Sequence, residues 1–286
     1  MAAGDLITND FEIEYRSELL GGSTGIEIVE FDIWTINDVR TNDLARPLDH
    51  GYFSGTDYYS WRSVTMQLEA WATDDATLKT LLDDVSRVVA VGDDEEPLVV
   101  QLPGYGKLLM NARPRRRVGP RIDQDYNMRV ARMNIEFFAT DPRIYSGTLS
   151  TALAQLVVSS PGLTFDATFD LSFGGVSESG IASCVNDGTF ETRPLIRIYG
   201  PIVNPTVENI TQDKIMQFTG TVSAGDYLEL DFLERTVLLN GSASRYSWLQ
   251  DSTKWFTLQP GTNDIRLGGS TSGSPYADIE WRSAWI

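Results

Sequence analysis

Apolar and polar residues alternate along several short stretches of the first 145 residues, which is the pattern of half-buried β-strands. In residues 64–70 the apolar side chains occupy every second position, with Thr65, Gln67 and Glu69 between them. This part of the chain is therefore expected to form a sheet with one buried face. The same pattern predicts further strands at residues 11–15, 26–33, 97–102 and 108–110.

Residues 126–138 predict one long strand whose apolar residues change phase along its length. Tyr126, Met128 and Val130 share one phase, and the apolar residues from Ala131 to Phe137 share the other. Because side chains of a strand alternate with a period of two, the change predicts a β-bulge near Val130 and Ala131. The alternative is a strand that is buried on both faces.

Between these strands, the spacing of apolar residues changes to that of one α-helix. From Asp75 onward the apolar residues recur at steps of three and one, which places them on one helical face. Thr73, Asp74 or Asp75 can cap the start, and Gly92 is expected to end the helix. The residues of the apolar face are Leu78, Leu81, Leu82, Val85, Val88 and Val89.

After residue 145, strands follow one another at short spacing, and no helical pattern interrupts them. Residues 163–173 alternate strictly, and residues 224–267 hold a run of predicted hairpins that includes an Asn240-Gly241 turn. Such a series of short strands is typical of an antiparallel sandwich or jelly roll. Other strands are predicted at residues 195–199, 207–210, 215–218, 255–258 and 277–281.

A domain boundary is expected near residue 145. Asp141-Pro142 ends the first series of strands, because proline cannot continue a ladder of backbone hydrogen bonds. Beyond it, serine, threonine and glycine become more frequent and arginine becomes rarer. A length of 286 residues suits two domains. We therefore predict domains at residues 1–145 and 146–286.

The composition excludes several kinds of chemistry. Cys184 and His50 are the only cysteine and histidine, whereas zinc sites and Ser-His-Asp or Cys-His catalysis draw on clusters of these residues. The chain also lacks phosphate-binding and calcium-binding loop motifs. We therefore predict no catalytic residues, no metal and no cofactor. No apolar stretch is long enough to span a membrane, and no signal peptide is visible at the start.

Charge is distributed unevenly along a chain whose formal net charge is −17. Seven arginines and only two acids fall between Arg113 and Arg132, and an acidic run precedes them at residues 93–96. Complementary blocks of this kind can set the register of a self-associating ring, although solvated loop faces give the same pattern. The candidate subunit contacts are Arg113, Arg115, Arg116, Arg117 and Arg121.

Aromatic residues near the end of the chain raise the question of sugar binding. Tyr246, Trp248 and Trp285 are the candidate carbohydrate contacts, since an aromatic ring can stack on a pyranose. Trp255 and Trp281 fall in predicted strands and are expected to fill a core instead. The second half contains no histidine, which weakens the carbohydrate interpretation further.

Three segments of the second half resemble the C-terminal galectin-like domain of siphophage distal tail proteins. They are IRIYGPIVNPTVEN (196–209), AGDYLELDFLERTVLLNG (224–241) and WFTLQPGTNDIRL (255–267). In the first half, FFATDPRIY (137–145) is similar to the end of the N-terminal domain of that family. The resemblance implies a mainly β fold: an N-terminal β-sandwich or split-barrel-like domain with one α-helix, then a C-terminal galectin-like antiparallel β-sandwich.

The resemblance also implies a structural role in the virion. Distal tail proteins form a ring, which we expect to be a homo-hexamer, at the tail tip. The ring joins the tail tube protein to the tail-associated hub protein and can hold receptor-binding proteins, with DNA only as passing cargo. We expect the protein to be made in the host bacterial cytoplasm. The alternative functions are a carbohydrate-binding adhesion module at the host surface, and a tail-tube or other baseplate subunit.

Overall fold

A computed structural model describes residues 2–22, 24–36, 38–120, 128–156, 180–271 and 273–286. The chain divides into two compact units. Unit 1 contains Met1–Thr148 and Trp285–Ile286, and unit 2 contains Leu149–Ala284. Along the chain, the division between the units falls between Thr148 and Leu149, and the last two residues are grouped with the first unit. Among the described helices, none is long and apolar enough to cross a membrane.

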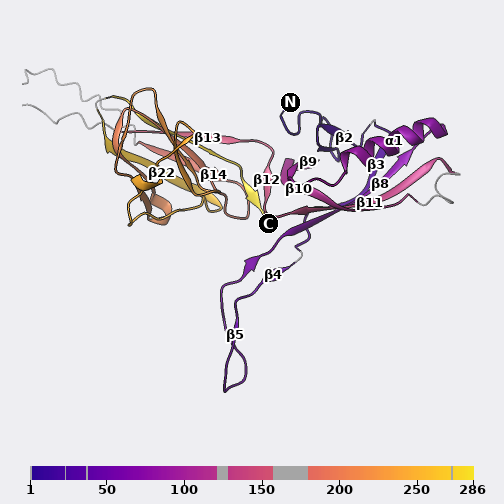
Figure 1. Ribbon diagram of the computed structural model, residues 1–286, viewed down its shortest axis with the longest axis horizontal. Coiled ribbons are helices and arrows are strands. Elements are labelled where there is room, and N and C mark those ends of the chain that lie inside the picture. The colour runs from indigo at the N-terminus through magenta and orange to yellow at the C-terminus, as the bar shows by residue number, and fades with distance from the viewer. Residues whose placement is uncertain (1, 23, 37, 121–127, 157–179, 272) are drawn as a thin grey trace, which may run out of the picture. The chain divides into compact units, whose positions relative to one another are not determined.

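Unit 1 is built on a bent antiparallel sheet that is closed on one side by a helix (Figure 1). Its strands lie in the order β2-β1-β9-β10-β11-β8-β3. The long strand β10 belongs to both halves of the sheet, since its first part pairs with β9 and its last part with β11. The strands are β1 (Ile13–Tyr15), β2 (Glu18–Leu20), β3 (Ile26–Asp32), β8 (Arg62–Trp71), β9 (Glu96–Leu102), β10 (Gly106–Val118), β11 (Val130–Ala139), β12 (Ile144–Ser146) and β24 (Ala284–Trp285).

The predicted helix is present as α1 (Asp75–Val88), and it is the one α-helix among the described residues. Asp74 caps its start, because the Asp74 carboxylate accepts the backbone N–H of Thr77 at 2.8 Å. The helix ends at Val88, before the expected stop at Gly92. The guanidinium of Arg16 donates to the carbonyl oxygens of Val88 and Ala90, so these orphan acceptors are satisfied without a glycine.

The apolar face of α1 packs on the inner face of the β3-β8-β11 part of the sheet. Leu78, Leu82, Val85 and Val88 are buried from the helix. Facing them in one continuous core are side chains from every second position of the two central strands. The strand residues of this core include Val64, Met66, Leu68 and Ala70 of β8 and Ala131, Met133, Ile135 and Phe137 of β11.

The bulge predicted near Val130 and Ala131 is wrong. β11 pairs with β8 without a register shift over its whole length, from Val130 opposite Trp71 to Ala139 opposite Arg62. The change of phase has another cause: β11 begins at Val130, and Arg129 before it has φ +53°, so Met128 is not part of the strand. Residues 126 and 127 lie outside the described residues.

A long hairpin joins β3 to β8 and extends away from the sheet (Figure 1). We call residues 33–61 the arm. Two short ladders hold its strands together, β4 (Val39–Arg40) with β7 (Tyr58–Tyr59) and β5 (Leu44–Ala45) with β6 (Tyr52–Phe53). All of these strand residues are exposed. These ladder residues therefore form no buried core between them.

Unit 2 is a sandwich of two antiparallel sheets, which confirms the expected mainly β fold class. The six-stranded sheet has the order β13-β23-β15-β19-β20-β21, and the five-stranded sheet joins β14, β22, β16, β17 and β18. Its strands are β13 (Ser150–Gln155), β14 (Ile181–Asn186), β15 (Leu195–Tyr199), β16 (Ile202–Asn209), β17 (Lys214–Gln217), β18 (Thr221–Val222), β19 (Tyr227–Asp231), β20 (Thr236–Leu239), β21 (Ala243–Ser244), β22 (Gly261–Ser270) and β23 (Tyr276–Trp281).

Local sequence signals place most of the unit 2 hairpins correctly. Asn240 and Gly241 have φ +51° and +67° and turn the chain from β20 into β21, as the Asn-Gly pair predicts. The strand predicted at residues 255–258 is wrong, because only Leu258 pairs, through one bridge to Thr192. Phe256 and Leu258 are nevertheless buried, so the alternation reflects packing without a ladder. The strand predicted at residues 163–173 lies outside the described residues.

Cys184 lies in β14 with its side chain in the core of unit 2. Burial raises the pKa of the Cys184 thiol to about 12, so the thiol is neutral in the folded protein at pH 8. We expect iodoacetamide to modify Cys184 only when unit 2 unfolds. Mass spectrometry after alkylation, with and without denaturant, measures this; rapid alkylation of native protein would contradict the burial.

Candidate assembly surfaces

The structure places the candidate arginines on a strand, whereas the sequence also allowed a solvated loop. Arg113, Arg115, Arg116 and Arg117 all belong to the last part of β10, and the last three are exposed. Arg121 lies outside the described residues. Four of the five candidates are therefore brought together on one strand.

Three of these arginines make contacts within unit 1. Arg113 donates to the backbone carbonyl of Asp93 at 3.0 Å, Arg117 donates to the hydroxyl of Ser86, and the Arg115 guanidinium lies 3.6 Å from the centre of the Phe138 ring. Arg116 makes no hydrogen bond or ion pair with any described residue. The acidic run at residues 93–96 is also partly paired within unit 1, because the Glu96 carboxylate forms an ion pair with Arg16 at 2.8 Å.

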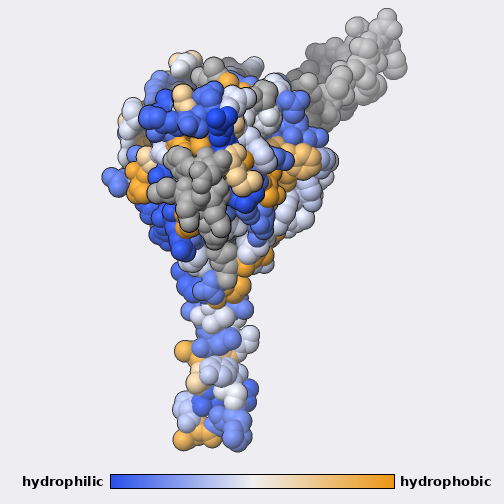
Figure 2. Space-filling model, turned by 90° about the vertical axis from the view of Figure 1, so that its right-hand side faces the viewer, coloured by the Kyte–Doolittle hydropathy of each residue, from blue (hydrophilic) through white to orange (hydrophobic). Residues whose placement is uncertain are grey.

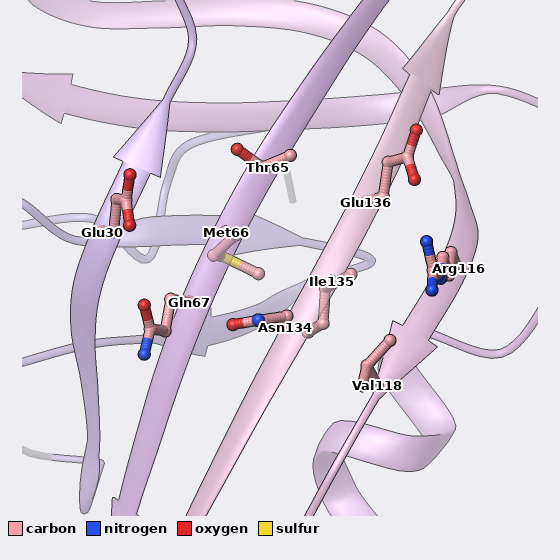
Figure 3. A pocket seen from close by; sticks show the side chains of 9 residues that line it. All are labelled: Glu30, Thr65, Met66, Gln67, Arg116, Val118, Asn134, Ile135 and Glu136. Atoms are coloured by element: carbon pink, nitrogen blue, oxygen red, sulfur yellow. The ribbon is translucent and has the colours of Figure 1, made fainter.

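The outer face of this part of the sheet is polar and slightly hollowed (Figure 3). The hollow has a volume of about 400 Å³ and crosses all four strands, β3, β8, β11 and β10. In Figure 3, Glu30 on β3 and Arg116 on β10 stand at opposite margins of the hollow. The residues that line it are Glu30, Thr65, Met66, Gln67, Arg116, Val118, Asn134, Ile135 and Glu136.

The pairing register arranges the outer face in rows that start with an acid on β3. One row runs Asp32–Thr65–Glu136–Arg116, and the next runs Glu30–Gln67–Asn134–Val118. A third row starts at Glu27 and continues through Glu69 to Arg132. The β3 margin is therefore acidic in every row, and the β10 margin carries Arg116 in the first of them.

Both margins are open strand edges among the described residues. β3 pairs only with β8, and β10 pairs only with β11 from Arg113 to Val118. Since every neighbouring pair in the order β3-β8-β11-β10 is antiparallel, β3 and β10 run in opposite directions. Open edges are templates for pairing with another chain, and these two would meet in antiparallel orientation.

The arm is a third exposed surface, and the sequence-based predictions did not include it. Hydrophobic and hydrophilic side chains alternate along it in Figure 2. The Arg46-Pro47 and His50-Gly51 turn signals, which lie between Leu44-Ala45 and Tyr52-Phe53, could have indicated a hairpin. Its large exposed apolar residues are Trp34, Ile36, Val39, Leu44, Leu48, Tyr52, Phe53, Tyr58, Tyr59 and Trp61.

The three candidate carbohydrate contacts divide between the units. Tyr246 and Trp248 share one 3₁₀ turn of unit 2, η3 (Tyr246–Trp248), where Tyr246 is exposed. The Trp248 ring packs on the core and lies so close to Gly220 that a Cβ there would come within 2.4 Å of it. Trp285 belongs to unit 1, where it packs on the core and meets Tyr105 edge-on at 6.1 Å.

The described residues hold no group of three or more His, Cys, Asp or Glu side chains placed to bind a metal ion. The surfaces above carry strand edges, rows of charge and exposed apolar side chains. These are the features of a surface that contacts other proteins.

Comparison with known proteins finds similarity to phage tail components. Residues 187–285 match the family model of the siphovirus-type tail component, C-terminal domain. No curated protein matches the sequence at a significant level.

Two solved structures have a similar fold. The first is the crystal structure of the SPP1 Dit protein, described as a paradigm of the hub adsorption apparatus in phages that infect Gram-positive bacteria; it is 10% identical, with a TM-score of 0.66, and the match covers 97% of this chain and 100% of that one. The second is a chain of the phage P2 baseplate in its activated, calcium-containing conformation, at 11% identity and a TM-score of 0.50, covering 96% and 98%. These findings confirm the resemblance to siphophage distal tail proteins: the chain has the Dit fold, and residues 187–285 match the siphovirus-type tail component, C-terminal domain.

Proposed function

We propose that this protein is the subunit of a homo-hexameric ring at the distal tip of a siphophage tail. Unit 1 makes the ring, and the ring joins the tail tube to the hub and to receptor-binding proteins. The fold shared with SPP1 Dit and the tail-component domain in residues 187–285 support a structural role in the virion.

The observation that carries the proposal is the pair of open, oppositely charged edges of unit 1. A contact between two different surfaces of the same chain is heterologous, and it closes into a ring when the rotation per subunit divides a full turn. The β10 edge of one copy and the β3 edge of the next meet in antiparallel orientation. Such pairing extends the sheet around the ring and covers both of these edges.

The rows of side chains on the outer face make this junction electrostatically favourable. Arg116 and the acids Asp32 and Glu30 point to the same face of the sheet, so pairing of the two edges places the arginine beside a carboxylate of the next copy. Arg116 has no ion-pair partner among the described residues of its own chain. An arginine and a carboxylate across a junction fix its register and disfavour wrong partners.

The arm supplies the apolar area that a stable ring requires. Specific interfaces bury about 1,200–2,000 Å², more than a single strand edge provides. The aromatic and aliphatic side chains of the arm are exposed on an isolated chain, and contact with a neighbouring subunit would bury them. We therefore assign the arm to a second contact between neighbouring subunits of this ring.

Reversing three charges of the β10 edge should prevent ring formation. In Arg115→Glu/Arg116→Glu/Arg117→Glu, like charges oppose each other at the junction, and we expect the dissociation constant of the contact to rise by about a hundredfold or more. Light scattering after size exclusion, together with negative-stain images, measures the fraction of protein in rings.

A matched variant with the same change of charge is Arg235→Glu/Arg245→Glu/Lys254→Glu in unit 2, which should still form rings. Adding Glu27→Arg and Glu30→Arg to the β10 variant restores opposite charges and should recover part of the assembly. Rings that form normally from the β10 variant, with the wild-type number of subunits, would refute the edge-pairing model.

A further inference from the structure

Three tyrosines form a row across the outer face of the six-stranded sheet of unit 2. Tyr199 of β15 stands directly opposite Tyr227 of β19 on one side and Tyr276 of β23 on the other. The rings of Tyr199 and Tyr276 are stacked, with centroids 4.7 Å apart and an interplanar angle of 19°. Tyr227 lies 5.5 Å from Tyr199 at 39°. The rings therefore stand upright on the sheet, in fixed orientations.

The next row of the same face holds an ion-pair network and one carboxylate, that of Asp278, which is not part of it. Arg197 lies opposite both Glu229 and Asp278 in the ladders. Its Nε donates to Glu229 at 2.8 Å and its Nη1 donates to Glu280 at 2.9 Å. Asp278 makes no hydrogen bond or ion pair with any described residue.

Asp278 lies close to an available aromatic surface. Tyr276 is two residues before it on β23, so the two side chains point to the same face. One side of the Tyr276 ring is covered by Tyr199, and the residue remains 38% exposed. Leu153, opposite Asp278 on β13, is 58% exposed and adds an apolar margin. Burial, and after it the neighbouring Tyr276 and Asp278, raise the pKa of Tyr199, which keeps the hydroxyl protonated at neutral pH.

We propose that this face of unit 2, which we call the tyrosine face, docks a partner protein through an arginine that binds Asp278 and stacks on Tyr276. A guanidinium can donate two parallel hydrogen bonds to a carboxylate while its plane lies on an aromatic ring, which a lysine ammonium cannot do. The proposal rests on the tail-tip role proposed above and adds a docking site on the second unit.

The charge and geometry of the tyrosine face favour a basic protein over a glycan. Glu229, Asp231, Asp278 and Glu280 lie on this face of β15, β19 and β23, where Arg197 is the one basic residue of the three strands, so the face attracts positive charge. The Tyr199 ring is stacked on Tyr276 on one side and has the tilted Tyr227 ring on the other, so the three tyrosines offer no open row of ring faces for sugar rings. Tyrosine and arginine are also the residues that concentrate binding energy in protein interfaces.

The test places a photocrosslinking amino acid on the tyrosine face of the full-length protein in assembled virions. Benzoylphenylalanine replaces Tyr276 in one variant and Leu153 in a second, because either residue alone could be needed for folding. Tyr246 of the same unit, exposed but outside the tyrosine face, is the control position. We expect crosslinks from positions 276 and 153 to one protein, at a peptide that contains arginine, and no crosslink to that peptide from position 246.

A second measurement tests the contribution of the Asp278 carboxylate separately. Asp278→Asn keeps the shape of the side chain, and combined with the crosslinker at position 153 it should reduce the crosslink yield about tenfold or more. Three results, obtained with virions that contain the protein, would each overturn the docking site alone. They are no crosslink from positions 276 and 153, a crosslink to a glycan or to a peptide without arginine, and a crosslink yield that Asp278→Asn leaves unchanged. Absence of the protein from virions would instead refute the tail-tip role.

Discussion

Replacing Arg62 with alanine should destabilise unit 1 by about 4 kcal/mol and lower its melting temperature by about 10 °C. Arg62 is 1% exposed at the start of β8, where the arm returns to the sheet. Its guanidinium donates to three backbone carbonyls, those of Ile33 at 2.9 Å, Thr35 at 3.1 Å and Pro142 at 2.7 Å. Alanine would leave these acceptors buried without partners.

The position of Arg62 connects its effect on stability to assembly. Ile33 and Thr35 begin the arm, and Pro142 follows the last long strand of unit 1, so one side chain holds three segments at the base of the arm. Burial lowers the pKa of Arg62, while the nearby Asp32 and Asp141 carboxylates act against this shift, and the group stays charged at neutral pH. We expect Arg62→Ala also to reduce ring formation at temperatures where the chain remains folded.

Two further variants make the Arg62 prediction specific. Arg62→Lys keeps the charge but cannot reach three separate carbonyls with one ammonium group, so we expect it to recover only part of the loss. Arg46→Ala removes an exposed arginine of the arm that pairs with Asp49 at 3.5 Å, and it should change stability by less than about 1 kcal/mol. Calorimetry measures all three. An Arg62→Ala protein as stable as the wild type would contradict the assigned role.

The sequence predicted those helices and strands in which the spacing of apolar residues follows from burial of one face against the core. The apolar face of α1 and the alternation in β8 follow directly from contact with one core, so periodicity located both. The same reasoning was wrong at residues 255–258, where Phe256 and Leu258 are buried but have no strand beside them. Alternation reports which side chains are buried, and it does not report whether a ladder partner exists.

The candidate surfaces depend on the order and register of strands, which the periodicity of apolar residues along one strand does not contain. The arginine block was visible in the sequence, but its placement on an open edge, opposite in direction to acidic β3, depends on the order of strands in the sheet. Similarly, Tyr199, Tyr227 and Tyr276 are far apart in the sequence and become neighbours only through the register of three strands. The arm could be recognised as exposed only once the core was known to lie elsewhere.

Replacing Asn186 with aspartate should destabilise unit 2 by about 4 kcal/mol. Asn186 is fully buried at the end of β14, and its amide makes four hydrogen bonds to backbone groups. Nδ2 donates to the carbonyls of Phe190 at 2.7 Å and Leu258 at 3.1 Å, and Oδ1 accepts the N–H groups of Gly188 at 3.1 Å and Ala284 at 3.2 Å. This side chain therefore joins three distant segments that have few ladder bonds of their own.

Aspartate has the shape of asparagine but loses the Nδ2 donors, so two buried carbonyls would face a carboxyl group. Asn209→Asp is the matched control, because Asn209 is equally buried, accepts from the N–H of Gln212 at 3.1 Å, and has an Nδ2 that donates to no described atom. Both variants bury a carboxyl group, and only Asn186→Asp removes donors in use. Chemical denaturation should therefore show a loss at position 186 larger by at least about 2 kcal/mol; equal losses would mean that burial of the acid, and not the missing donors, determines the cost.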